Sequence, residues 1–173
     1  MSILANKDTY VVIQGGVAGV NAARRMGEFC YLIKRSLNVL AFVYPPDAGK
    51  THEIPYGSGL VAVPIYKTVA EATKNHPQIN TSLVYIGADR ALKGGMEALD
   101  DSHIKVVSMI TEGVPEKDAK ILGHHATKLG KVFNGPSSIG IVSAGSCRLG
   151  VIGGAFDNLV LSKLYREGSF GVI

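Results

Sequence analysis

The sequence has few residues of the kinds that carry thiol or metal chemistry. Its only two cysteines, Cys30 and Cys147, lie in apolar or Gly/Ser-rich surroundings and form no CxxC pair. We therefore expect buried reduced thiols, or an incidental free thiol, rather than a disulfide or a metal site. None of the five histidines shows HExxH or CxxC-type ligand spacing. The adjacent His124 and His125 are expected at the surface or at a helix cap.

Signals for nucleophilic catalysis, secretion and membrane insertion are also missing. Ser137, Ser138 and Ser143 stand outside any GxSxG elbow, so Ser-His-Asp catalysis has no support. No apolar run reaches the roughly 18 residues that a membrane helix needs. The segment before Asp8 has neither a long apolar region nor a cleavage-site pattern. These absences predict a cytoplasmic protein without a membrane span.

The sequence has few charged residues and a small net charge. Charged residues make up 18% of the 173 residues, and the formal net charge is +4. This balance suits a phosphorylated ligand but is too weak and too scattered to indicate nucleic-acid binding. The densest basic cluster, Arg24-Arg25 with Lys34-Arg35 further on, is expected to be a solvated helix face. The length favours one domain with a sizeable core.

What the sequence does contain is a regular alternation of buried strands and amphipathic helices. Continuous apolar runs predict strands at 10–13, 39–44, 60–63, 82–86, 104–110 and 131–133. Helical spacing predicts helices at 17–34, 66–74, 88–99, 115–129 and 156–166. The segment between Pro46 and Leu60 is expected to be a loop, and Pro64 to end the strand before it. Strands alternating with helices predict an α/β fold, Rossmann-like, with a mostly parallel, doubly wound sheet.

The pattern changes after Gly140. Small residues dominate as far as Gly154, and Gly168 begins a further apolar run in which the sequence stops. We therefore expect a Rossmann-like domain at 1–140 and a connecting segment at 141–173 that leads toward a second domain of a longer chain. An unfinished sheet edge at 169–173 would favour self-association.

A glycine-rich turn follows the first predicted strand and opens the first helix, with the sequence Gly15-Gly16-Val17-Ala18-Gly19-Val20. Glycines let a backbone approach a phosphate, and a helix N-terminus supplies N–H groups and partial positive charge. The GGxxG spacing is not the dinucleotide fingerprint GxGxxG, and no acidic residue ends the second strand, where Tyr44 stands. A tight strand-to-helix turn without a ligand is the alternative interpretation.

Two charged residues stand at further strand ends, Lys50 and Glu112. Gly49-Lys50-Thr51 resembles the last three residues of the P-loop motif GxxxxGK(S/T), but the first glycine of that motif is missing. Lys50 is therefore either a solvated lysine or a point charge for a phosphate. Glu112 either caps the helix that follows, a contact worth about 0.3–1 kcal/mol, or faces a ligand at the carboxyl edge of the sheet.

Several segments together resemble the CoA-binding domain of the succinyl-CoA synthetase α subunit. They are Thr111-Glu112-Gly113-Val114-Pro115 and Gly135-Pro136, joined by the segments 10–19, 43–45 and 63–69. The segments 153–158 and 162–169 are similar to the ATP-citrate lyase and citryl-CoA synthetase branch, since succinyl-CoA synthetases carry a shorter segment there.

The resemblance implies a coenzyme A site. Its implied contacts are Gly15, Gly16, Val17, Ala18, Gly19, Val20, Lys50, Ile110, Thr111 and Glu112. The family usually has Thr-Gly-Ser-Gln-Gly in the first loop, so the residues from Val17 to Asn21 leave binding there to backbone N–H groups. Ser137-Ser138-Ile139 replaces the Asn-Cys-Pro of succinyl-CoA synthetases, as a different acyl substrate would require.

The resemblance also implies which parts of the enzyme lie elsewhere. In the family, phosphate passes from ATP to a histidine of a second domain and then to citrate, where CoA replaces it. None of the five histidines matches that residue, so this fragment alone is expected to be inactive. ATP and Mg would be bound by a nucleotide-grasp β-type subunit or domain of an oligomeric enzyme of the reductive TCA cycle. The alternatives are a succinyl-CoA synthetase α fragment, an NAD-binding oxidoreductase domain and a non-catalytic CoA-binding module.

Overall fold

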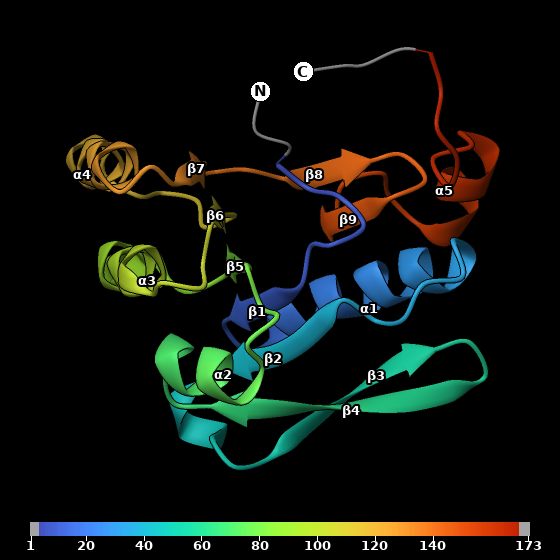
Figure 1. Ribbon diagram of the computed structural model, residues 1–173, viewed down its shortest axis with the longest axis horizontal. Coiled ribbons are helices and arrows are strands. Elements are labelled where there is room, and N and C mark those ends of the chain that lie inside the picture. The colour runs from blue at the N-terminus through green and yellow to red at the C-terminus, as the bar shows by residue number, and fades with distance from the viewer. Residues whose placement is uncertain (1–3, 170–173) are drawn as a thin grey trace.

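The computed structural model describes residues 4–169, and a seven-stranded sheet forms their centre (Figure 1). The spatial order of the strands is β3-β4-β2-β1-β5-β6-β7. Neighbouring strands run parallel except for the antiparallel pair β3–β4. The strands are β1 (Val11–Gln14), β2 (Val39–Val43), β3 (Thr51–Tyr56), β4 (Gly59–Tyr66), β5 (Thr81–Val84), β6 (Val106–Met109) and β7 (Val132–Asn134).

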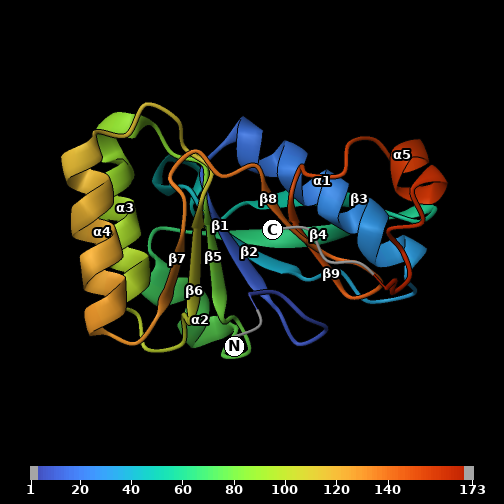
Figure 2. The ribbon, with the colours of Figure 1, turned by 90° about the horizontal axis from the view of Figure 1, so that it is seen from above.

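Helices cover both faces of the sheet (Figure 2). They are α1 (Val17–Leu32), α2 (Val69–Asn75), α3 (Ala88–Asp100), α4 (Glu116–Lys128) and α5 (Phe156–Leu161), with a short 3-10 turn η1 (Pro45–Asp47). Side chains alternate along β1, so that Val11 and Ile13 share a core with α1, and Val12 shares one with α2, α3 and α4. The predicted α/β fold with a doubly wound sheet is confirmed. Between residues 4 and 169, no helix is long and apolar enough to cross a membrane.

The segment predicted as a loop after Pro46 is instead half of a hairpin, so this part of the prediction was wrong. β3 occupies the expected loop, and β4 runs through Pro64 to Tyr66 rather than stopping there. Proline is tolerated because β4 pairs with β2 only at Ile65 and Tyr66, so no ladder bond toward β2 is lost at Pro64. The other predicted strands and helices lie within a few residues of the observed ones, apart from the shorter α5.

A second hairpin, β8 (Gly140–Ser143) and β9 (Cys147–Gly150), was missed by the sequence patterns. Cys147 and Leu149 of β9 are buried in the same core as α1, so the segment just after residue 140 packs with the domain. That the segment 141–173 leads on toward a second domain stays a prediction. Of the strand expected at 169–173, residues 170–173 lie outside the described residues.

Candidate functional site

The course of the chain creates a crevice between β1 and β5. From β1 the chain passes through α1 to β2 on one side, and after α2 it returns to β5 on the other side of β1. Where the strand order reverses in this way, the loops at the carboxyl ends diverge and leave room for a ligand. A cleft of about 750 Å³ lies at this point, between the ends of β1, β2 and β5 and the starts of α2 and α3. Its volume is in the usual range for small-molecule sites.

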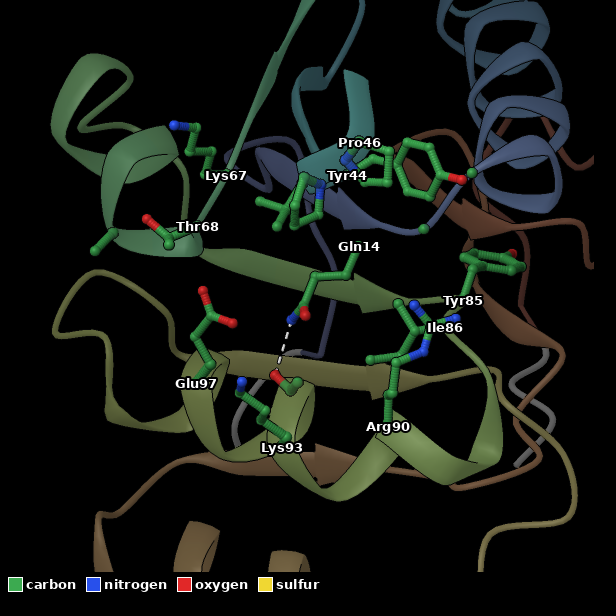
Figure 3. A pocket seen from close by; sticks show the side chains of 16 residues that line it. Gln14, Tyr44, Pro46, Lys67, Thr68, Tyr85, Ile86, Arg90, Lys93 and Glu97 are labelled. Carbon is green, nitrogen blue, oxygen red and sulfur yellow. Dashed lines mark hydrogen bonds between the residues drawn. The ribbon is translucent and has the colours of Figure 1, made fainter. Parts of the chain in front are cut away.

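The walls of the cleft are largely apolar (Figure 3). One wall is the end of β2 and the η1 turn, and the facing wall is the end of β5 and the start of α3. The apolar and aromatic lining residues are Val43, Tyr44, Pro45, Pro46, Ala70, Tyr85 and Ile86. Burial raises the pKa of Tyr85 to about 12, so the phenol stays neutral at physiological pH.

The first glycine loop contributes its first two residues to the cleft. Gly15 adopts φ +139°, and a Cβ there would lie 2.9 Å from Cβ of Tyr85, so only glycine lets β1 turn this close to β5. Gly16 follows as the residue before α1 and also lines the cleft. Val17 and Ala18 are exposed on the first turn of α1, outside the cleft lining.

The other two predicted residues of this loop serve packing between α1 and the sheet. A Cβ on Gly19 would lie 2.7 Å from Cγ2 of Ile13, so glycine allows α1 to lie close to β1. Val20 packs against the buried cluster on the α1 side. Two of the six predicted loop residues, Gly15 and Gly16, therefore line the cleft.

Three cations around the cleft were missed by the sequence reasoning: Lys67, Arg90 and Lys93. Arg90 and Lys93 stand one turn apart near the start of α3, and Lys67 follows β4. In the described part of the chain, their closest ion pair is the loose contact of 3.8 Å between Nε of Arg90 and Asp89. Their positive charge therefore stays available to an anionic ligand. Helical spacing of Arg90 and Lys93 was the signal in the sequence that went unused.

The acidic residue on the same wall already has a structural partner. Glu97 Oε1 accepts a hydrogen bond of 2.7 Å from the backbone N–H of Val69, the first residue of α2. The carboxylate thus satisfies an N–H group that has no partner within its own helix. The side chain of Thr68 accepts a second such bond, of 3.1 Å, from the N–H of Glu71. The two bonds fix the start of α2 beside the cleft.

Two adjacent glycines let α3 pack closely, Gly94 against Ile86 just after β5 and Gly95 against Leu122 of α4. A Cβ on Gly94 would lie 2.4 Å from Cδ1 of Ile86, and one on Gly95 would lie 2.7 Å from Cδ2 of Leu122. Each glycine lowers helix stability by about 1 kcal/mol relative to alanine. The close approach explains why two glycines stand inside α3 despite this cost.

Lys50 lies in a second hollow rather than in the cleft. Its Nζ forms an ion pair of 2.6 Å with Asp47, and this hydrogen bond raises the pKa of Lys50. The hollow has a volume of about 480 Å³ and is lined by the segments 48–51 and 64–67 together with Glu71. Lys67 lines both the hollow and the cleft, so the two sites adjoin.

The predicted strand end at 110–112 lies beyond β5, outside the lining of the cleft. The hydroxyl of Thr111 donates a hydrogen bond of 2.7 Å to the carbonyl of Ile86, which ties this strand end to that of β5. Glu112 is exposed. The segment at 111–115 lies beside the turn that follows Gly135-Pro136, because the N–H of Ser137 donates to the carbonyl of Thr111 at 3.0 Å.

A sequence model described as the CoA binding domain matches residues 6–113, which is more than half of the chain. The chain belongs to the CoA-binding domain family. This match confirms the resemblance to a CoA-binding domain that the sequence motifs indicated. The domain is homologous to part of ATP-citrate lyase.

Curated relatives and solved structures agree on the branch of the family. The domain is 33% identical over 150 residues to ATP-citrate synthase beta chain protein 1 of Oryza sativa, covering 87% of this chain and 25% of that protein. It is 32% identical over 171 residues to a probable ATP-citrate synthase of Caenorhabditis elegans, covering 98% of this chain and 15% of that protein.

Two solved structures resemble this chain more closely in fold than their sequence identities suggest. The ATP citrate lyase of Methanothrix soehngenii in complex with citrate and coenzyme A matches with a TM-score of 0.91 and 33% identity, over 96% of this chain and 27% of that chain. The Methanosaeta concilii enzyme in complex with (3S)-citryl-CoA matches with a TM-score of 0.91 and 34% identity, over the same shares. The chain spans about a quarter or less of the length of these relatives.

Proposed function

We propose that the chain binds coenzyme A in the cleft between β1 and β5. The observation that carries the proposal is the pairing of apolar walls with three cations, Lys67, Arg90 and Lys93, at one edge of the sheet. Coenzyme A combines an adenine ring with a pyrophosphate and a 3′-phosphate, so it needs both an apolar slot and positive charge. The bound ligands of the Methanothrix and Methanosaeta structures support this assignment.

The phosphates would lie where the cations and helix starts converge. Arg90 and Lys93 provide charge-assisted hydrogen bonds from α3, and Lys67 reaches the same cleft from the end of β4. The first turn of α1, which Gly16 precedes, adds backbone N–H groups that have no partner within the helix. Because Val17 and Ala18 carry no hydroxyl, any contact there uses the backbone. Lys50, Ile110, Thr111 and Glu112 remain proposed contacts for other parts of coenzyme A, next to the cleft.

The whole protein would be an ATP-dependent enzyme that forms citryl-CoA from citrate and CoA. A histidine outside this chain would carry the phosphate, and ATP with Mg would be held by a nucleotide-grasp subunit or domain. We place the oligomeric enzyme in the cytoplasm and in the reductive TCA cycle. A succinyl-CoA-forming enzyme is the second candidate, and the acyl preference of the complete enzyme for citrate over succinate separates the two.

Calorimetric titration of coenzyme A into the chain tests the binding proposal. Charge-assisted hydrogen bonds contribute about 1.5–3 kcal/mol, so Arg90→Ala or Lys93→Ala should weaken binding about tenfold or more. Lys117→Ala is the matched control, because Lys117 is an exposed lysine on α4 outside the cleft lining. A folded chain that gives no heat at high micromolar coenzyme A, or cleft variants that bind like the control, would contradict the proposal.

A further inference from the structure

One of the polar side chains that line the cleft is buried. Gln14, the last residue of β1, is only 2% exposed, yet it lines the cleft (Figure 3). A buried amide carries two N–H donors and one carbonyl acceptor, and each left without a partner costs free energy. The partners of Gln14 therefore show which of its atoms is left for a ligand.

Both donors of the Gln14 amide are used inside the protein. Nε2 donates to the backbone carbonyl of Gly94 at 2.9 Å and to the hydroxyl oxygen of Ser82 at 3.1 Å. A backbone carbonyl only accepts, so the amide atom that faces Gly94 must be the nitrogen, which fixes the orientation of the amide. Oε1 receives no hydrogen bond from any residue in the described range 4–169. The free atom of Gln14 is thus a fixed acceptor.

Gly94 leaves this acceptor uncovered. A Cβ on Gly94 would lie 2.8 Å from Oε1 of Gln14, so any larger residue would crowd the acceptor. Gly94 also lines the cleft, which opens the path between Oε1 and a ligand. This is a second reason, besides helix packing, for a glycine in the middle of α3.

We propose that Gln14 selects the adenine ring of the ligand by accepting a hydrogen bond from its 6-amino group. The inference rests on the proposed function, because it assumes that coenzyme A occupies the cleft. The surroundings favour a flat ring: Tyr44 and Pro46 lie on one side of Gln14, and Ile86 lies on the α3 side (Figure 3). The cations of the cleft then face the phosphates attached to the adenosine. A 6-oxo base would turn a second acceptor toward Oε1 and would be rejected.

Two nucleotides that differ only at this position test the selection. Adenosine 3′,5′-bisphosphate and inosine 3′,5′-bisphosphate carry the same phosphates, with an amino group and a keto group at position 6. Leaving a buried polar group unpaired costs enough to weaken binding about 5- to 150-fold, so we expect the inosine compound to bind weaker by that factor. Coenzyme A itself is titrated in parallel.

Two variants separate the role of Gln14 from general damage. Gln14→Leu removes the acceptor, and Gly94→Ala covers it while leaving Gln14 in place; both should lose most of the preference for adenosine. Gly123→Ala is the matched control, because it makes the same change in α4, where no described residue comes within 4 Å of the new Cβ apart from the backbone of that helix. Circular dichroism establishes that each variant is folded.

The outcomes distinguish the two proposals. Coenzyme A binding with equal affinities for the two bisphosphates overturns the role of Gln14 and leaves the proposed function standing. The same conclusion follows if Gln14→Leu weakens the binding of coenzyme A while the wild type binds the adenine and hypoxanthine compounds equally. The acceptor would then bind another N–H group. Absence of coenzyme A binding to the folded wild type removes the proposed function and this inference with it.

Discussion

Replacing Gly15 by alanine should destabilise the domain strongly, because two separate costs add at this position. Alanine at φ +139° occupies a backbone region that side chains rarely adopt, which costs about 1–3 kcal/mol. Its Cβ would also lie 2.9 Å from Cβ and 3.0 Å from the carbonyl oxygen of Tyr85. Overpacking of that kind costs about 1–3 kcal/mol more. The expected total is about 2–6 kcal/mol, a large part of the roughly 5–15 kcal/mol by which domains are stable.

Urea unfolding followed by far-UV circular dichroism measures this loss. With a slope of about 2 kcal/mol per molar urea, a loss of about 4 kcal/mol moves the midpoint by about 2 M. Gly123→Ala is the control, because Gly123 lies inside α4 and its new Cβ would meet nothing within 4 Å among the described residues apart from the backbone of its own helix. We expect no loss there, since alanine is the better helix former by about 1 kcal/mol. A Gly15→Ala variant that unfolds at the wild-type midpoint would refute the close approach of β1 to β5.

Three further predictions concern buried groups. Arg148 is fully buried, and its guanidinium donates to three carbonyls, so Arg148→Leu should lower the free energy of unfolding by about 3 kcal/mol or more, measured by urea titration; an unchanged midpoint contradicts this. Burial raises the pKa of the Cys30 thiol and raises that of Cys147 to about 11. Ellman's reagent at pH 8 should therefore label the two thiols only after unfolding, and fast labelling of native protein would be the contrary result. Tyr85 ionises near its ordinary pKa of about 10 when unfolded but at about 12 when folded, so the unfolded state loses its proton first and stability falls as pH rises from 10 to 12. Cys147 adds a loss between about pH 9 and 11 in the same direction. Because the Tyr85 hydroxyl has no hydrogen-bond partner among the described residues, Tyr85→Phe should cost little at pH 7 and flatten the alkaline fall in melting temperature; an equally steep fall would argue against it.

The sheet and its helices were predictable because short-range patterns of apolar residues indicate which strands and helix faces are buried. Continuous apolar runs such as the one at β1 are typical of strands covered on both faces, and β1 is fully buried. Strand β3 escaped prediction because its sequence, from Thr51 to Tyr56, has no continuous apolar run and only Ile54 of it is buried. The β8–β9 hairpin escaped because its key residues, Cys147 and Leu149, pack on a helix more than a hundred positions earlier in the sequence.

The position of the cleft could be predicted from the sequence, but most of the side chains that line it could not. Glycines after a buried strand indicated the end of β1, and Gly15 and Gly16 line the cleft. Arg90 and Lys93 looked like ordinary surface charges of a helix, because their role depends on Gly94 bringing α3 toward Gln14. That approach joins residues 80 positions apart through a hydrogen bond. Interactions over such separations leave no periodic signal in a single sequence.

Amide chemical-shift mapping of the isotope-labelled chain during a titration with coenzyme A tests the central claim most directly. Binding in the cleft predicts saturable shifts at Gly15, Gly16 and Gly94, which line it, and none at Gly123 on α4. Saturable shifts confined to other parts of the domain, or no shifts at millimolar coenzyme A, would contradict a coenzyme A site between β1 and β5.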